Sequence, residues 1–130
     1  MSYYFNTTLK EKNFDKAIKT VTAALKEEGF GVLTEIDVKE TLKKKIDVDF
    51  KKYRILGACN PVFAHKALKN EDKIGVFLPC NVIVEENENG EIEVSAVDPI
   101  SSMQAAKNDS LEEIATEVQQ KLKKIIASLN

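Results

Sequence analysis

Apolar residues follow the helical period in two long segments of the chain. In residues 14–28 they recur every three or four positions, which is the spacing of one helical face. Asn13 precedes this segment in the position of an N-cap, and Gly29 follows it as a residue that commonly ends helices. Residues 111–129 carry a second stripe, introduced by the capping box Ser110-Leu111-Glu112-Glu113. Two long amphipathic helices are therefore predicted.

Between these helices, several shorter apolar runs have the features of strands. Aromatic and β-branched residues predict a first strand over 2–9. Further strands are expected over 30–36, 53–58, 74–78, 81–86 and 91–97. Pro79 separates the fourth expected strand from the fifth, because proline cannot donate to a strand ladder. Asn87-Glu88-Asn89-Gly90 carries a hairpin signal, and the strand after it alternates apolar and polar residues, as expected for one solvated face.

Short helices are expected in three of the connections. Asp37-Val38-Lys39-Glu40 is a capping box that begins a helix with only a thin apolar edge. Asn60-Pro61 begins another, with Asn60 as the cap and proline in the first helical position, and this helix should end near Asn70. One helical turn is expected at 103–107, after Asp98-Pro99 has ended the last strand.

This order of elements predicts an α+β fold. A mainly antiparallel sheet would carry the two long helices on one face, as a two-layer sandwich with additional short helices. The other face would be solvated, covered by the short helices, or covered by a second subunit. At 130 residues the chain is expected to be a single domain, 1–130, which needs no disulfide or metal to support its core.

Composition and charge exclude several classes of protein. An apolar content of 43% and a charged content of 31% are ordinary for a soluble globular domain. The net charge of −2 and the absence of a basic cluster give no reason to expect nucleic acid as a partner. No apolar run reaches 18 residues, so no membrane partner is expected. The first residues lack the pattern of a signal peptide, which favours a cytoplasmic protein with reduced thiols.

The only two cysteines lie in similar polar settings. They occur in Gly57-Ala58-Cys59-Asn60-Pro61 and in Leu78-Pro79-Cys80-Asn81-Val82. Cys59 precedes the start of a predicted helix, whose partial positive charge should favour the thiolate. Whether the two sulfurs approach each other depends on a strand register that the sequence leaves open. Buried structural thiols, a ligand site and a redox pair all remain alternatives.

The remaining polar candidates are two asparagines, one glutamate and one histidine. Asn60 is explained by its N-cap position, whereas Asn81 either satisfies the backbone beside Pro79 or faces a cavity. Glu35 is a candidate general base, and His65 is expected to be exposed on its helix. One histidine and two cysteines do not complete a zinc site, and no glycine-rich phosphate loop is present, so neither metal nor cofactor is expected. The candidate ligand-binding residues are Cys80, Asn81, Cys59, Asn60 and Glu35.

Both Cys-Asn motifs, taken with the segments around them, resemble a known family. Ala64 and Leu68, Ile74-Gly75, the acidic Asn-Gly hairpin, Asp98-Pro99 and the early Thr34-Glu35-Ile36-Asp37-Val38 complete the pattern. Together they resemble the domain of unknown function 302 (DUF302) family of bacteria and archaea, over about residues 1–128. The resemblance implies a TATA-binding-protein-like α+β fold, ordered β-α-β4-α, and a homodimer. It implies neither DNA binding nor any reaction.

These observations favour a non-catalytic module, because no complete catalytic constellation is present. The expected function is small-ligand binding or an accessory role, in a homodimer with a pocket around the two Cys-Asn motifs. One alternative is a thiol-dependent enzyme or redox sensor that uses Cys59 or Cys80 and lowers the pKa of one thiol. A second alternative is a purely structural or interaction domain whose open sheet face forms the dimer interface.

Overall fold

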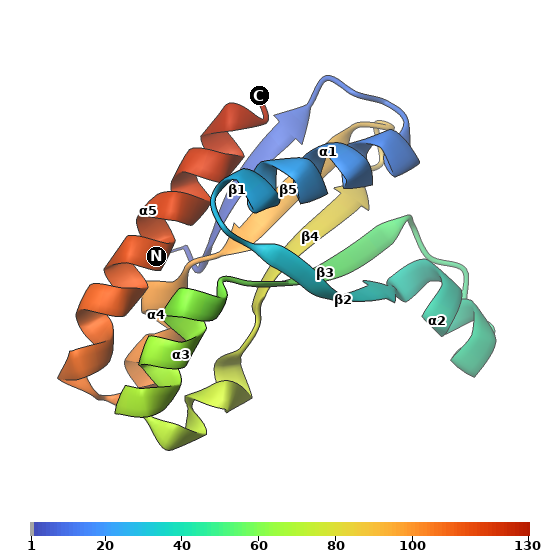
Figure 1. Cartoon of the computed structure of the whole chain (residues 1–130). Coiled ribbons are helices and arrows are strands. Elements are labelled where there is room, and N and C mark those ends of the chain that lie inside the picture. Colours follow the sequence, from blue (N-terminus) through green and yellow to red (C-terminus); the bar gives the residue numbers. More distant parts are fainter. Residues whose placement is uncertain (1) are drawn as a thin grey trace.

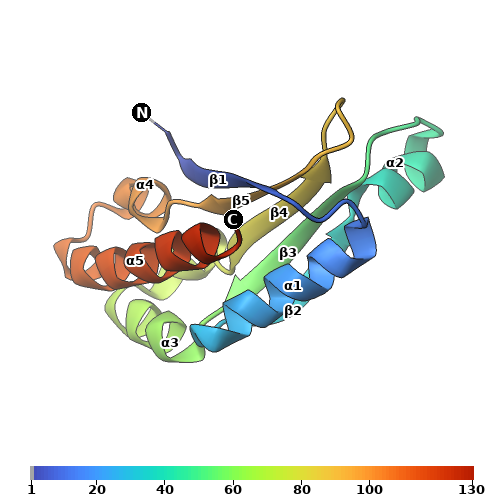
Figure 2. The ribbon, with the colours of Figure 1, turned by 90° about the horizontal axis from the view of Figure 1, so that it is seen from above.

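The two apolar stripes form the two long helices of the structure. In a computed structural model that describes residues 2–130, α1 spans Phe14–Glu27 and α5 spans Glu112–Ser128. Both helices lie on the same side of a sheet (Figures 1 and 2). As predicted, the Asn13 side chain caps α1, since it accepts a hydrogen bond of 2.9 Å from the backbone N–H of Lys16.

Five antiparallel strands form one sheet in the order β1-β5-β4-β3-β2. The strands are β1 (Tyr4–Leu9), β2 (Gly31–Asp37), β3 (Tyr53–Cys59), β4 (Cys80–Glu86) and β5 (Ile92–Val97). The long elements therefore follow one another as β-α-β4-α, and the predicted α+β class is confirmed. β1 and β2 are the two edges of the sheet.

The core lies between the sheet and the long helices. Alternate residues of each strand face the helices, because successive side chains of a strand point to opposite faces. In β4, for example, Cys80, Val82 and Val84 are buried, while Asn81 is exposed and Ile83 only partly buried. Each fully buried aliphatic side chain contributes about 1.5–3 kcal/mol to the hydrophobic stabilisation. The second face of the sheet carries neither α1 nor α5 (Figure 2).

Three shorter helices occupy connections, as expected. They are α2 (Val38–Ile46), α3 (Pro61–Asn70) and α4 (Pro99–Met103). α2 begins at the predicted cap, because the Asp37 carboxylate accepts a 3.0 Å hydrogen bond from the backbone N–H of Glu40. This helix lies at the end of the molecule remote from α3 (Figure 1) and buries none of its side chains.

The segment between α3 and β4 is not a strand, which corrects the prediction for 74–78. Asp72–Phe77 form a 3₁₀ helix, η1, held by a backbone hydrogen bond of 3.1 Å from Leu78 to Gly75. Of this segment only Ile74 is buried, and Val76 is 81% exposed. Periodicity does not separate a short apolar run in a strand from one in a helical turn. Here β3 pairs with β4 from Cys80 onward and β5 from Val82 onward, so no neighbouring strand pairs with the preceding run.

The start of α5 differs from the predicted capping box. Leu111 occupies the N-cap position, and no side chain caps the helix there. Instead, the Asn108 side chain accepts a 3.0 Å hydrogen bond from the backbone N–H of Ser110 and begins a 3₁₀ turn, η3 (Asp109–Leu111), that runs into α5. The capping role predicted for the Ser110 hydroxyl is therefore performed by the Asn108 side chain.

The helical turn predicted at 103–107 begins earlier in the chain. α4 starts at Pro99, and the Asp98 carboxylate caps it by accepting a 3.0 Å hydrogen bond from Ile100. A second 3₁₀ turn, η2 (Gln104–Ala106), continues it. The Asp98-Pro99 pair thus ends a strand and also begins a helix, with proline where its missing N–H is tolerated.

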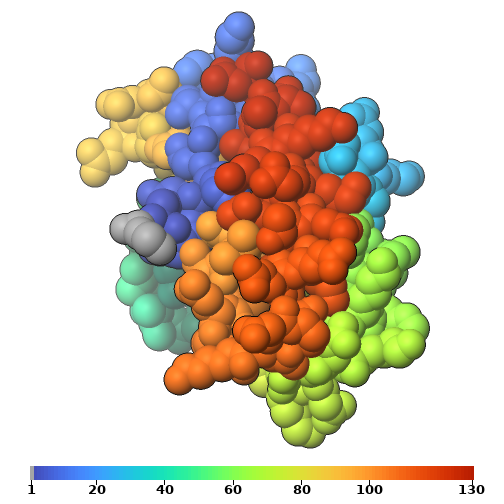
Figure 3. Space-filling model, turned by 90° about the vertical axis from the view of Figure 1, so that its left-hand side faces the viewer, coloured from blue at the N-terminus to red at the C-terminus, as the bar shows by residue number. Residues whose placement is uncertain are grey.

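α5 is the longest helix and forms one side of the molecule. With 17 residues it is about 26 Å long. Figure 3 shows it running over most of the height of this side, between the N-terminal strand and the α3 region. Within residues 2–130, no helix combines the length and apolar character required to cross a membrane.

Candidate functional site

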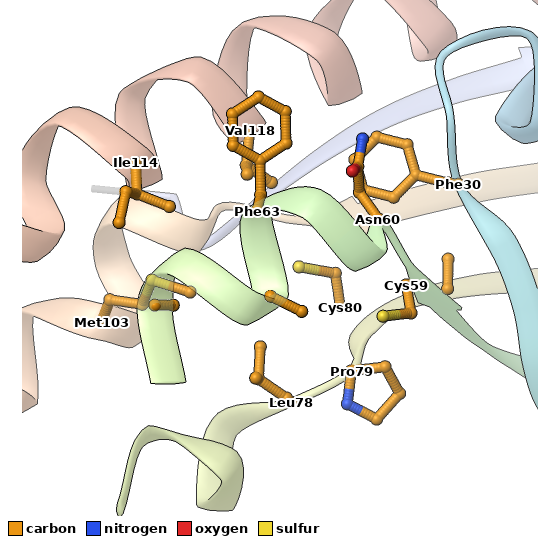
Figure 4. A pocket seen from close by; sticks show the side chains of 13 residues that line it. Phe30, Cys59, Asn60, Phe63, Leu78, Pro79, Cys80, Met103, Ile114 and Val118 are labelled. Carbon is orange, nitrogen blue, oxygen red and sulfur yellow. The ribbon is translucent and has the colours of Figure 1, made fainter. Parts of the chain in front are cut away.

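Both cysteines line one small cavity beneath α3 (Figure 4). Cys59 ends β3, Cys80 begins β4, and the remaining walls are mainly apolar side chains, among them Phe63 of α3 and Met103 of α4. The cavity volume is about 20 Å³. That is room for about one water molecule, because a single water needs roughly 10–15 Å³ measured in this way. An organic ligand would enter only if a wall moved.

The register of β3 and β4 turns the Cys59 and Cys80 side chains to opposite faces of the sheet. Ala58 lies directly opposite Cys80 in the antiparallel ladder, so Cys59 is one residue further along the neighbouring strand. Cys59 is also the last residue of β3, where the chain leaves the sheet for α3. The register thus answers the question that the sequence left open: the two side chains lie on opposite faces, and Cys59 lines the cavity from the end of β3.

A glycine allows the chain to reach this arrangement. Gly57 faces Asn81 across the ladder, and a Cβ at this position would collide with the Thr34 hydroxyl. The same Cβ would lie 2.9 Å from the Pro79 ring, closer than atoms can approach without a shift. Pro79 can therefore pack against the backbone of β3, immediately before Cys80, only because residue 57 has no side chain.

Asn60 occupies the predicted N-cap position of α3, but its side chain does not cap the helix. Its amide Nδ2 instead donates a 3.3 Å hydrogen bond to the carbonyl of Glu28, at the end of α1. The N-cap role is thus corrected: Asn60 ties the start of α3 to the α1–β2 turn. Because Asn60 also lines the cavity, this hydrogen bond holds the cavity wall at the start of α3 in place.

Burial disfavours the thiolate form of both cysteines. Burial raises the pKa of Cys80 to about 11, and the neighbouring Cys59 adds to this effect. Burial also raises the pKa of Cys59, which is less deeply placed. The pKa of Cys59 is thus raised by burial, whereas the position before α3 had predicted a lowered pKa. His65 is exposed, as predicted, and does not line the cavity.

Two of the candidate residues lie away from the cavity. Asn81 is exposed and faces the opposite side of the sheet from Cys80, where it lines an open groove with Tyr4 and Ile83. Glu35 accepts a 2.9 Å hydrogen bond from the Arg54 guanidinium, which also bonds Asp37 at 3.3 Å. The structure therefore groups Cys59, Asn60 and Cys80 and separates Asn81 and Glu35 from them.

Met103 is a cavity residue that the sequence reasoning missed. Its side chain is buried and contributes a third sulfur atom to the cavity wall. A lone methionine in a poorly predictable segment gives no local signal of such a position, because it lies in sequence more than 20 residues after Cys80. The turn that Asp98 and Pro99 form at the end of β5 is what brings α4 beside the cavity.

Comparisons with known proteins agree with this fold but give no activity. The family model described as "Domain of unknown function DUF302" matches residues 5–129. The chain is also similar to a solved structure, the crystal structure of an uncharacterized conserved protein DUF302 from Bacillus stearothermophilus, with 28% sequence identity and a TM-score of 0.91. That similarity covers 100% of both chains. No curated protein matches the sequence.

Replacing Gly57 by alanine should destabilise the protein by about 1–3 kcal/mol, because Pro79 or Thr34 must shift to admit the new methyl group. Chemical denaturation measures this difference. Gly31→Ala is the matched control: a Cβ at Gly31 meets nothing within 4 Å, so this variant should keep wild-type stability within about 0.5 kcal/mol. Equal stability of the two variants would contradict the close approach of Pro79.

Alkylation of either thiol should be slow at neutral pH and accelerate as the pH rises, because only the thiolate reacts and burial raises both pKa values. The single-cysteine variants Cys80→Ala and Cys59→Ala separate the two rates, which mass spectrometry of iodoacetamide adducts measures. The same variants unfolded in urea serve as controls and should titrate near the free-thiol pKa of about 8.5. If the pH midpoint of alkylation were lower in the folded variant than in the unfolded control, the raised pKa of that thiol would be contradicted.

Proposed function

We propose that this chain, which belongs to the DUF302 family, is a homodimeric small-ligand-binding module and not a thiol-dependent enzyme. The cavity beneath α3 is the observation that carries this proposal. Its lining includes Cys59, Asn60 and Cys80 among mainly apolar side chains, and neither histidine nor a carboxylate lines it. A catalytic thiol needs a base within hydrogen-bond reach, whereas a binding site needs only a shaped apolar space with a few polar groups.

The wall formed by α3, which the η1 segment follows in the chain, is the natural route of entry. α3 buries only Ala67 and η1 buries only Ile74, whereas α5 buries six residues. Segments with few buried contacts open at lower free energy than the rest of a fold. A shift of this wall would enlarge the cavity and admit a ligand larger than one water.

The alternatives from the sequence are less well supported. A thiol enzyme or redox sensor needs an accessible thiolate, and the pKa of each thiol is raised instead of lowered. Both cysteines are free, which suits the reducing cytoplasm where we place the protein. A pure interaction domain would leave the sulfur-lined cavity without a role.

The open face of the sheet supports the homodimer. The protein has three tyrosines, and all of them line the groove on this face: Tyr3, Tyr4 and Tyr53. Ile83 and Val97 lie among them, and the groove has a volume of about 430 Å³. Tyrosine is enriched at protein interfaces because its ring supplies apolar area while its hydroxyl keeps a polar partner.

A second copy of the chain is the occupant that this face fits best, because α2 is complementary to it. α2 buries none of its side chains, leaves Ile46 63% exposed and carries Lys43, Lys44 and Lys45. Glu85 and Glu93 line the groove, and Lys51 already pairs with Glu85 at 2.6 Å, which leaves Glu93 for a lysine of α2. Lys43 and Lys44 pair with carboxylates near α2, whereas Lys45 makes no ion pair among residues 2–130. One pair of this kind, added to the apolar side chains exposed on both surfaces, favours self-association in a defined orientation.

Small apolar probes should bind in the cavity, and filling it should abolish their binding. We expect dimethyl sulfide and thiophene to shift the amide NMR signals of Cys80 and Ala67 with millimolar affinity, as suits probes of so few atoms. Ala64→Leu places three extra carbon atoms in the cavity wall and should remove the shifts. Ala105→Leu makes the same change at an exposed site and should keep them. Absence of shifts in the wild type, or their persistence in Ala64→Leu, would contradict the site.

The dimer should dissociate when its open face becomes charged. Ile83→Lys places an ammonium group among the tyrosines and should weaken self-association at least about tenfold, as measured by sedimentation equilibrium. Val76→Lys makes the same change on η1, where the side chain is 81% exposed, and should leave the dimer intact. A wild-type protein that sediments as a monomer at tens of micromolar would refute the homodimer.

A further inference from the structure

A row of three side chains crosses the open face of the sheet. Tyr53 of β3 lies opposite Glu85 of β4, and Glu85 lies opposite Glu93 of β5. Residues directly opposite one another in a ladder point to the same face. All three side chains line the groove of about 430 Å³, on the face that carries neither α1 nor α5 (Figure 2). One aromatic ring and two carboxylates are thus aligned across neighbouring strands.

The first part of this row already holds an ammonium group, that of Lys51. Its Nζ lies 2.6 Å from the Glu85 carboxylate and 5.8 Å from the centre of the Tyr53 ring. The centre of the Phe50 ring lies 6.0 Å from the same nitrogen. A carboxylate attracts a cation through its charge, and an aromatic ring does so through its quadrupole. The chain's own lysine therefore illustrates the chemistry that this row accepts.

Glu93 is the second carboxylate of the row, and it makes no ion pair within residues 2–130. Its two oxygens accept hydrogen bonds of 3.2 Å from the Asn6 amide and 2.9 Å from the Asn87 amide, which fix its orientation. Like charges directly opposite each other destabilise a sheet, and Lys51 pairs only with Glu85. A carboxylate accepts up to about four hydrogen bonds, so Glu93 keeps acceptor capacity for a second cation.

The floor of the groove beside Glu93 is polar as well. Ser95 follows two residues later on the same face of β5 and is 8% exposed. Its hydroxyl oxygen accepts a 2.8 Å hydrogen bond from the Asn6 amide, the same amide that holds Glu93. A hydroxyl oxygen has two lone pairs, so one acceptor position remains open. Because Ile83 and Val97 also line the groove, a matching ligand combines a cationic donor with a short apolar chain.

We propose that this groove binds a small primary alkylammonium ion, with its ammonium group on Glu93 and its alkyl chain along Ile83 and Val97. Such an ion stays charged at neutral pH, because its pKa resembles the value of about 10.4 for lysine. A lysine side chain is itself a four-carbon alkylammonium, so the free ion and a lysine of the second copy's α2 compete for Glu93. This competition rests on the homodimer proposed above, and by mass action the ion favours the monomer.

Tyrosine fluorescence of the full chain reports on this groove directly, because the protein has no tryptophan and all three of its tyrosines line the groove. The probe is n-butylammonium chloride, which reproduces the lysine side chain. We expect a saturable change with a millimolar midpoint, as suits a probe of so few atoms. Butan-1-ol has the same chain without the charge and should give no saturable change. Sodium chloride at equal ionic strength is the control for screening.

Glu93→Gln removes the charge at nearly constant volume and should raise the midpoint at least about tenfold, because the ammonium group loses its charged acceptor. Glu88→Gln makes the same change at an exposed position outside the groove and should bind like the wild type. The amide NMR signals of Glu93 and Ser95 locate the ion in the wild type independently of any variant. In sedimentation equilibrium, n-butylammonium should shift the wild type from dimer toward monomer more than sodium chloride does.

A wild-type response no greater than that to butan-1-ol or sodium chloride would overturn the site, and so would an unchanged midpoint in Glu93→Gln. If the ion binds but leaves the wild-type dimer intact, the competition is wrong and the homodimer stands. If the ion binds a protein that is already a monomer at tens of micromolar, the homodimer fails and the alkylammonium site stands.

Discussion

The antiparallel register between β3 and β4 is the constraint on which the candidate site depends. It sets Ala58 opposite Cys80 and Gly57 opposite Asn81, so the ends of the two Cys-Asn motifs meet. A shift by one residue would turn every side chain of β4 to the other face and carry Cys80 out of the core. The bare backbone at Gly57, against which the Pro79 ring packs, leaves little freedom for such a shift.

The same sheet separates two kinds of surface. Its inner face is covered by α1 and α5 and holds the sulfur-lined cavity at one end (Figures 2 and 4). Its outer face gathers the tyrosines, two carboxylates and Asn81 in an open groove. Because successive residues of a strand point in opposite directions, Cys80 and Asn81 are adjacent in sequence and yet serve different surfaces. The proposed ligand binding and the proposed self-association therefore involve separate surfaces of the sheet.

Burial gives the two cysteines their chemical character. Apolar surroundings disfavour the thiolate, which makes the thiols poor nucleophiles at neutral pH and raises the pKa of Cys80 to about 11.

Local sequence determined the long helices, the Asn87–Gly90 hairpin, the Asp37 cap and the α+β class, because periodicity and turn chemistry act between near neighbours. Tertiary structure decided the rest. Residues 74–78 had the composition of a strand, but no neighbouring strand pairs with them. Asn60 had the position of a helix cap, but its side chain donates a hydrogen bond to the carbonyl of Glu28 instead. The place of Cys80 and Met103 in one cavity wall, and the raised pKa of both thiols, depend on register and burial, which arise from contacts between distant segments and leave no local pattern.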